Sequence, residues 1–109
     1  MMEKKILGSL GLCAKAGKLI YGAPMTIEAM QKGKKVHLVL EAGDTSDNTH
    51  KRLTDKCNFY GVEKIRLNLD GSALGAAVGK TSSLAAVAIT DEGFYKMVSK
   101  YFQENNNLG

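Results

Sequence analysis

A chain of 109 residues has room for one hydrophobic core, so we expect a single domain over residues 1–109. Its 15 Lys and Arg outnumber its 11 Asp and Glu, and the net charge of +4 suits a polyanionic partner. The two cysteines are too few for a disulfide framework and lie outside any metal-ligand spacing, so we expect no metal site and a reducing, cytoplasmic location. No stretch is long and apolar enough to span a membrane.

The first segment is typical of an amphipathic helix over residues 3–16. Its apolar residues Ile6, Leu10 and Cys13 recur at the helical spacing. This periodicity favours a folded helix over the signal peptide that its basic start and apolar run imitate. A short strand is predicted next, at residues 18–21.

The second helix, predicted over residues 24–32, begins without a capping side chain. Pro24 fits the first helical position, which places Ala23 at the N-cap. Alanine cannot accept a hydrogen bond from the free N–H groups of the first turn. These donors, at the positive end of the helix, are therefore available to water or to an anionic or acceptor-rich ligand.

A buried strand and a third helix are predicted in the middle of the chain. The run at residues 36–40 is apolar almost throughout, as in a central strand covered on both faces. Ser46 or Asp47 can cap the following helix, which Gly61 ends. Its inward positions, repeated at the helical spacing, are Leu53, Cys57 and Tyr60.

The segment after this helix predicts an edge strand, a short helix, a polar loop and a second buried strand. Apolar and polar residues alternate over residues 65–69, which favours a strand at or near an edge. Asp70 can cap a short helix that ends at Gly79. A polar loop at residues 80–83 leads to an apolar strand at residues 84–89.

The chain closes with a helix that begins at Thr90 or Asp91. One stripe of this helix carries its apolar residues, which are Phe94, Met97, Val98, Tyr101 and Phe102. The alternation of helices and strands along the chain predicts an α/β fold. We expect a three-layer α-β-α sandwich, in which helices cover both faces of a four-stranded mixed sheet.

No pattern in the sequence indicates an enzyme, a cofactor or catalytic residues. The stretch Gly75–Thr81 imitates a phosphate-binding P-loop, but its spacing fails by one residue and it follows a helix, so a helix end explains it. His37 falls within a predicted buried strand and His50 within a helix. Neither has a nucleophile or carboxylate at a spacing that proposes a triad.

Three separate segments can meet at one end of the predicted sheet. They are the turn at residues 22–25, the end of the strand at Glu41, and the loop from Lys80 to Leu84. Together they offer free helix N–H groups, a lysine, hydroxyls and an apolar side chain. This mixture suits irregular RNA, where base edges are exposed and a base can be extruded.

Five stretches carry a resemblance to a known family, and they are Ala16–Gly22, Gly22–Gly33, Leu38–Glu41, Leu74–Lys80 and Ala85–Ile89. On these stretches the chain resembles the kink-turn-binding ribosomal protein family, the L-seven-Ae and L-thirty-e superfamily, in its small bacterial form. The spacing matches without gaps between Gly22 and Gly33.

The resemblance implies a monomeric RNA-binding protein associated with the ribosome or another ribonucleoprotein, with ribosomal RNA among its possible partners. Its structured RNA would be a kink-turn or related internal loop, read by the start of the second helix while the loop before the last strand shelters a flipped-out nucleotide. Lys18 would meet phosphate, and Glu41 would lie at the rim. The implied RNA-binding residues are Lys18, Gly22, Ala23, Pro24, Met25, Glu41, Lys80, Thr81, Ser82, Ser83 and Leu84.

The chain departs from the family at the base-reading positions. Pro24, Met25 and Glu28 stand where the family has Asn, Glu and Lys. Proline and methionine cannot make the side-chain hydrogen bonds that specify bases, and Glu28 would face phosphates with a negative charge. Two hypotheses stay open, namely an RNA-binding protein and a family member that has lost RNA specificity and serves as a protein-interaction module.

Overall fold

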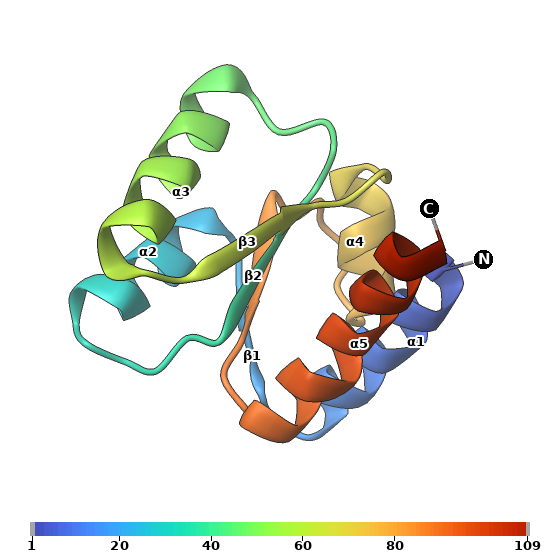
Figure 1. Cartoon of the computed structure of the whole chain (residues 1–109). Coiled ribbons are helices and arrows are strands. Elements are labelled where there is room, and N and C mark those ends of the chain that lie inside the picture. The colour runs from blue at the N-terminus through green and yellow to red at the C-terminus, as the bar shows by residue number, and fades with distance from the viewer. Residues whose placement is uncertain (1, 109) are drawn as a thin grey trace.

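The computed structural model describes residues 2–108, and the side chains of residues 4–102. Helices and strands alternate along the chain (Figure 1). In order they are α1 (Met2–Lys15), β1 (Leu19–Tyr21), α2 (Ala23–Gln31), β2 (Leu38–Glu41), α3 (Asp47–Tyr60), β3 (Glu63–Arg66), α4 (Gly71–Ala77), β4 (Ala86–Ile89) and α5 (Glu92–Leu108). Within the described residues, no helix combines the length and apolar character that crossing a membrane requires.

The strands form one mixed sheet in the order β1-β4-β2-β3. β2 and β3 are parallel, whereas β4 is antiparallel to both of its neighbours, β1 and β2. β3 lies at an edge, as its alternation of apolar and polar residues predicted. The last strand of the chain is therefore inserted between the first and the second.

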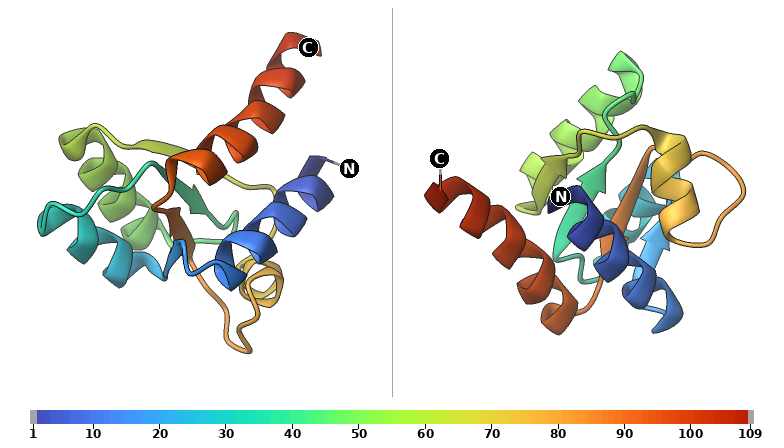
Figure 2. Two further views of the ribbon diagram at one scale, coloured as in Figure 1. Left: turned by 90° about the horizontal axis from the view of Figure 1, so that it is seen from below. Right: turned by 90° about the vertical axis from the view of Figure 1, so that its right-hand side faces the viewer.

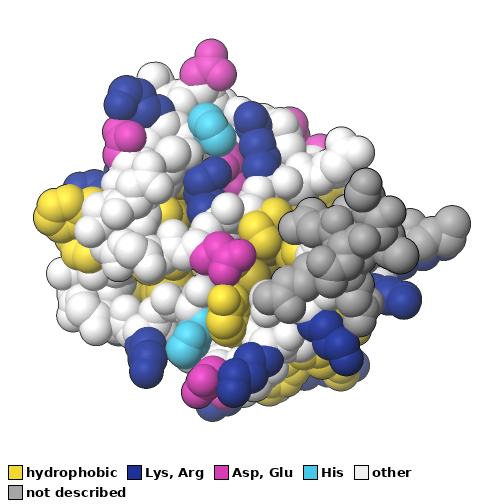
Figure 3. Space-filling model, viewed as in Figure 1, with side chains coloured by type: hydrophobic (Ala, Val, Ile, Leu, Met, Phe, Trp, Pro, Cys, Tyr) yellow, Lys and Arg dark blue, Asp and Glu magenta, His cyan; other side chains and the backbone are white. Residues whose placement is uncertain are grey.

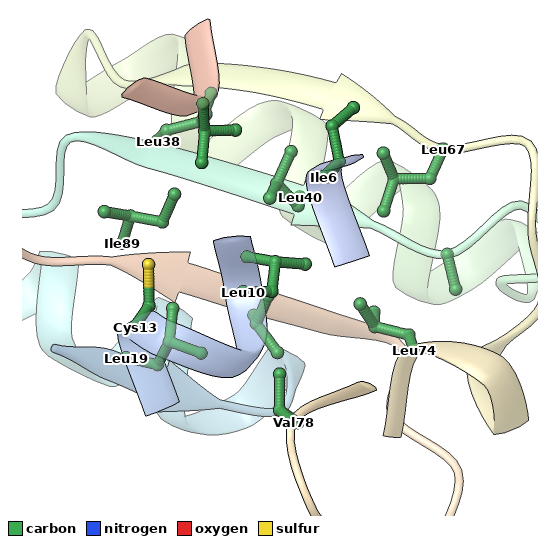
Figure 4. Close-up of a cluster of buried hydrophobic side chains, with 13 residues drawn as sticks. Ile6, Leu10, Cys13, Leu19, Leu38, Leu40, Leu67, Leu74, Val78 and Ile89 are labelled. Atoms are coloured by element: carbon green, nitrogen blue, oxygen red, sulfur yellow. The ribbon is translucent and has the colours of Figure 1, made fainter. Parts of the chain in front are cut away.

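Helices cover both faces of this sheet, which confirms the predicted α/β class and three-layer architecture (Figure 2). On one face α1, α4 and α5 pack over Leu38, Leu40 and Ile89 (Figure 4). On the other face α2 and α3 pack over Val39. Because successive side chains of a strand point to opposite faces, the same alternation directs Glu41 toward α3.

Three predicted helix caps, at Ser46, Asp70 and Asp91, are confirmed, and they explain why α3, α4 and α5 begin where they do. The Ser46 hydroxyl accepts a hydrogen bond from the Thr49 N–H at 3.2 Å, and Asp70 Oδ1 accepts one from the Ala73 N–H at 2.8 Å. Each bond pairs one of the donors that a helix start leaves free, and is worth about 1 kcal/mol. Gly61 ends α3 in the left-handed conformation, at a φ of 68°.

Three predictions about individual residues were wrong in detail. His37 precedes β2, which starts at Leu38 where pairing with β3 begins, and its half-buried ring stacks on Tyr95 with centroids 5.8 Å apart. β3 ends at Arg66, three residues earlier than predicted, because the chain then turns to pack against the loop after β2. Tyr60 is 39% exposed rather than buried, because it is the last residue of α3 and packs against the neighbouring aromatic ring instead of the core.

Candidate nucleic-acid interface

Three connecting segments meet at one end of the sheet, which we call the loop end. They are residues 22–25 after β1, residues 42–45 after β2 and residues 80–85 before β4. The Gly22 N–H donates to the Ala86 carbonyl at 2.8 Å, and the Ala42 N–H donates to the Ala85 carbonyl at 2.8 Å. β1 and β2 therefore end on either side of the start of β4, and the expected convergence of these segments is observed.

The first segment turns directly from β1 into α2 through Gly22. This glycine is the N-cap, with φ 90° and ψ 152°, so the predicted cap at Ala23 was one residue late. The left-handed φ, which glycine tolerates, allows the abrupt change from strand to helix. The Thr26 N–H already bonds to the Gly22 carbonyl at 3.0 Å, and Pro24 has no N–H. No side chain caps this start, so its open donors are the N–H groups of Ala23 and Met25.

The exposed surface of this turn is apolar, and its nearest acidic residue is paired. Pro24 is exposed, and Met25 is 54% exposed. One turn later, Glu28 binds Lys32, with the carboxylate oxygen and Nζ 2.6 Å apart. The hydrogen bond and charge of Lys32 lower the pKa of Glu28, which keeps it ionised. The negative charge expected to face phosphates is thus offset by Lys32.

The third segment, residues 80–85, is fixed against α4 by backbone contacts. The Lys80 N–H donates to the Gly75 carbonyl at 2.9 Å, and the Leu84 N–H donates to the Gly71 carbonyl at 3.0 Å. A Cβ on Gly75 would overlap the Ser82 carbonyl oxygen, so only glycine permits this approach. The loop is therefore held at both ends before any ligand arrives.

One side chain of this loop, that of Lys80, lies over an aromatic ring of β1. Lys80 is exposed, and its Nζ lies 4.3 Å from the centroid of the Tyr21 ring, a cation–π distance. Leu84 is half-buried against the core. The remaining loop residues are exposed, and they are Thr81, Ser82 and Ser83. The loop thus presents hydroxyls and a lysine beside an apolar floor.

The second segment, residues 42–45, is tied to the same loop through Asp44. Its Oδ1 accepts a hydrogen bond from the Gly71 N–H at 2.9 Å, and the Gly71 carbonyl in turn holds Leu84. The Gly43 N–H also donates to the Leu69 carbonyl at 2.7 Å. Asp44 therefore helps to hold the segments of the loop end together, through a bond to Gly71, which lies 27 residues later in the chain.

Lys18 does not lie with the other predicted site residues. It precedes β1 at the far end of the sheet, where its carbonyl accepts the Thr90 N–H at 3.0 Å. The chain from Lys18 to Gly22 is extended, which separates the two by about 13 Å. The exposed side chain of Lys18 thus belongs to the opposite end of the sheet. The two residues lie at opposite ends because β1 runs along the length of the sheet between them.

Glu41 does not lie at the rim either, because it is fully buried between the sheet and α3. One carboxylate oxygen is 2.6 Å from Lys64 Nζ, and the other is 2.8 Å from His50 Nδ1 and 3.9 Å from Arg66 Nε. Burial alone would raise the pKa of Glu41, but the bonds from Lys64 and His50 hold it below its ordinary value. In Figure 3 a histidine flanked by basic side chains is visible over α3. Glu41 is thus an internal anion that joins α3 to β3.

Residues 4–99 match the model of the ribosomal protein L7Ae/L30e/S12e/Gadd45 family. The chain is also similar to two curated proteins named RNA-binding protein YlxQ. The protein from Bacillus subtilis (strain 168) is 38% identical over 85 residues, which cover 78% of this chain and 82% of the relative. The protein from Enterococcus faecium is 31% identical over 101 residues, which cover 93% of this chain and 94% of the relative.

Solved structures share the same architecture. A protein of unknown function from Bacillus halodurans superposes with a TM-score of 0.81 at 31% identity, covering 91% of this chain and 97% of the other. The 15.5kD RNA binding protein of Giardia lamblia superposes with a TM-score of 0.77 at 20% identity, covering 99% of this chain and 90% of the other. At that identity, the second match speaks for the fold alone.

Proposed function

The chain belongs to the ribosomal protein L7Ae/L30e/S12e/Gadd45 family, and from this premise we propose that it binds RNA through the loop end and catalyses no reaction. The observation that carries the proposal is the meeting of an uncapped helix start with a fixed loop of exposed hydroxyls and one lysine. Two relatives named as RNA-binding proteins, at 38% and 31% identity, support it.

We further propose that the ligand is a structured RNA with a kink-turn or a related internal loop, in a ribosomal or other ribonucleoprotein setting. The N–H groups of Ala23 and Met25 supply donors for the acceptors that an opened groove exposes. Lys80 supplies a phosphate contact. Residues 81–84 supply hydroxyls and an apolar surface for an extruded base.

The residues at the base-reading positions set the character of this binding. Pro24 and Met25 offer no side-chain hydrogen bond to a base edge, so reading falls to the backbone of the turn. Glu28 is already bound to Lys32, so it repels phosphates less than a free carboxylate would. We therefore expect RNA affinity with less base discrimination than an Asn and Glu pair would give.

One observation favours a second function. Met25 is 54% exposed, and this apolar surface at the start of α2 suits a protein contact as well as an RNA contact. A family member that has lost RNA specificity and serves as a protein-interaction module would keep this surface. Its binding to RNA would be absent or independent of the loop end.

The test measures affinity for a standard kink-turn RNA and for the same RNA with its G·A pairs replaced, at two salt concentrations. Lys80→Ala removes one loop-end charge, and Lys100→Ala removes an exposed charge from α5 as the matched control. Met25→Asp places a negative charge at the start of α2, where it stabilises the helix but repels phosphate. Unfolding of each variant is followed by circular dichroism.

The proposal predicts that wild type and Lys100→Ala prefer the intact kink-turn. Lys80→Ala should weaken binding and lower the salt dependence by about one ion, and Met25→Asp should weaken it without loss of stability. If both RNAs bind equally, and binding is lost in Lys80→Ala but not in Lys100→Ala, the loop end is supported as the RNA interface and the proposed kink-turn specificity is rejected. No RNA binding at all would favour the protein-interaction module.

A further inference from the structure

A second surface with the chemistry of a nucleic-acid site lies at the end of α2 remote from the loop end. Phe59 is 79% exposed, and its ring lies nearly perpendicular to the ring of Tyr60, with centroids 4.9 Å apart and an interplanar angle of 83°. Because most of the Phe59 side chain is uncovered, its ring is accessible to a stacking partner. In Figure 3 hydrophobic side chains project at the left margin, over the C-terminal end of α3.

A hollow of about 260 Å³ lies beside these rings, where the C-terminal ends of α2 and α3 approach each other (Figure 1). Met30, Val36 and Val62 contribute apolar surface to it, and Met30 is buried. Tyr60 connects the hollow to Phe59. We call these rings, the hollow and its two lysines, Lys34 and Lys35, the aromatic patch.

The charge at the aromatic patch is positive. Lys34 and Lys35 are exposed, and the lysine salt bridges found among residues 4–102 involve Lys32, Lys51, Lys64 and Lys96 instead. The acidic residues of the neighbouring elements have other partners. Glu28 binds Lys32 at 2.6 Å, and Glu63 accepts a hydrogen bond from the Tyr95 hydroxyl at 3.0 Å.

The aromatic patch is continuous with the loop end along α2. The nine residues of this helix span about 14 Å, a distance that a few nucleotides of single strand can bridge. A smaller hollow of about 80 Å³ lies between the two sites, and both Met25 of the turn and Lys34 of the patch line it. Glu28 and Lys32 line it as well and bind each other at 2.6 Å, so the positive charge of this path comes from Lys34.

On this basis, and resting on the proposed function, we propose that the aromatic patch binds a single-stranded segment flanking the structured RNA at the loop end. A base stacks on Phe59, and phosphates meet Lys34 and Lys35. An exposed aromatic ring combined with a basic groove is the arrangement that single-stranded sites use, and it accepts any base because every base has a stacking face. An acidic peptide would also bind the two lysines, but its binding would not require the exposed Phe59 ring outside the hollow.

The test compares a blunt kink-turn RNA with the same RNA carrying a short oligouridine tail. Phe59→Ala removes the ring, and a Lys34→Ala, Lys35→Ala double variant removes the charges. Leu12→Ala is the matched control, because Leu12 is also a large exposed apolar side chain, 55% exposed on α1. Circular dichroism verifies that each variant is folded.

We expect the tail to strengthen binding of wild type and of Leu12→Ala by about tenfold, the worth of one stacked base. Phe59→Ala should lose most of that gain and bind blunt RNA as wild type does. A tail that adds nothing, or a gain that survives in Phe59→Ala, overturns the proposal. So does an acidic oligoglutamate peptide that binds in a Phe59-dependent manner while the tail adds nothing, because the occupant would then be a protein.

The failure of the proposed function gives a different result. If wild type does not bind the blunt RNA, the loop-end proposal fails, and oligouridine alone then tests the aromatic patch. Binding of oligouridine that is weakened in Phe59→Ala but not in Leu12→Ala supports the patch as an independent single-strand site. No binding of oligouridine overturns it.

Discussion

Replacing the buried Glu41 by glutamine tests whether this residue stabilises the fold or contacts RNA. The carboxylate is fully buried and bonds to Lys64 and His50, and Lys64 is only 12% exposed. Glutamine keeps the shape but loses the charge. It also turns an N–H₂ group toward at least one of these donors, so Lys64 remains nearly buried without a counter-ion.

Breaking a buried ion pair by removing one partner costs about 3–5 kcal/mol. We expect the lower end, about 3 kcal/mol, because His50 and Arg66 are partly exposed and can turn to water. For a domain of this size this loss lowers the melting temperature by about 12 °C. RNA affinity, measured at a temperature where the variant is folded, should stay close to that of wild type.

Urea and thermal unfolding followed by circular dichroism measure the loss. A Glu41→Leu, Lys64→Met double variant is the control, because removing both charges together should recover much of the stability. The reasoning is refuted if Glu41→Gln unfolds within about 1 kcal/mol of wild type. Lost RNA affinity at unchanged stability would instead restore the interpretation of Glu41 as a rim residue.

Other predictions concern acid, packing and thiol chemistry. The native pKa of Glu41 is below its ordinary value of 4.5, so the stability that the ionised carboxylate contributes is present above pH 4.5 and is lost as the pH falls below the native pKa. When unfolding is measured as a function of acid pH, Glu41→Gln should therefore lose less stability than wild type. Gly75→Ala, whose Cβ overlaps a loop carbonyl, should lower unfolding free energy by about 1–3 kcal/mol and weaken RNA binding. Gly8→Ala, which has open space, should raise that free energy slightly, and equal effects of the two substitutions would contradict this view. Burial raises the pKa of Cys13 and Cys57 to about 11, so a thiol reagent at pH 8 should label the native protein far more slowly than the unfolded protein. Rapid labelling of the folded protein would contradict this expectation.

The elements of the fold were predictable because their signals are local. Apolar periodicity located each helix, and the caps at Ser46 and Asp70 lie within three residues of the N–H groups they bind. The continuous apolar run before Glu41 identified a central strand. The order of strands was not predictable, because nothing in residues 86–89 indicates that they separate β1 from β2.

The candidate site was less predictable, because its key contacts join distant parts of the chain. A charged residue after an apolar run indicates a strand end at the surface, whereas Glu41 is buried by partners 9 and 23 residues later. Lys18 is close to Gly22 in sequence but lies across the sheet from it. Helical spacing predicted Tyr60 to face the core, and only the position of the helix end puts its ring outside.

The insertion of β4 between β1 and β2 has a consequence for biosynthesis. During synthesis β1 emerges early but has no neighbouring strand until residues 86–89 have left the ribosome. Until then the Gly22 N–H also lacks the Ala86 carbonyl that anchors the turn into α2. A nascent chain that stops before β4 therefore lacks the strand that joins β1 to β2 and with it the hydrogen bonds that assemble the loop end.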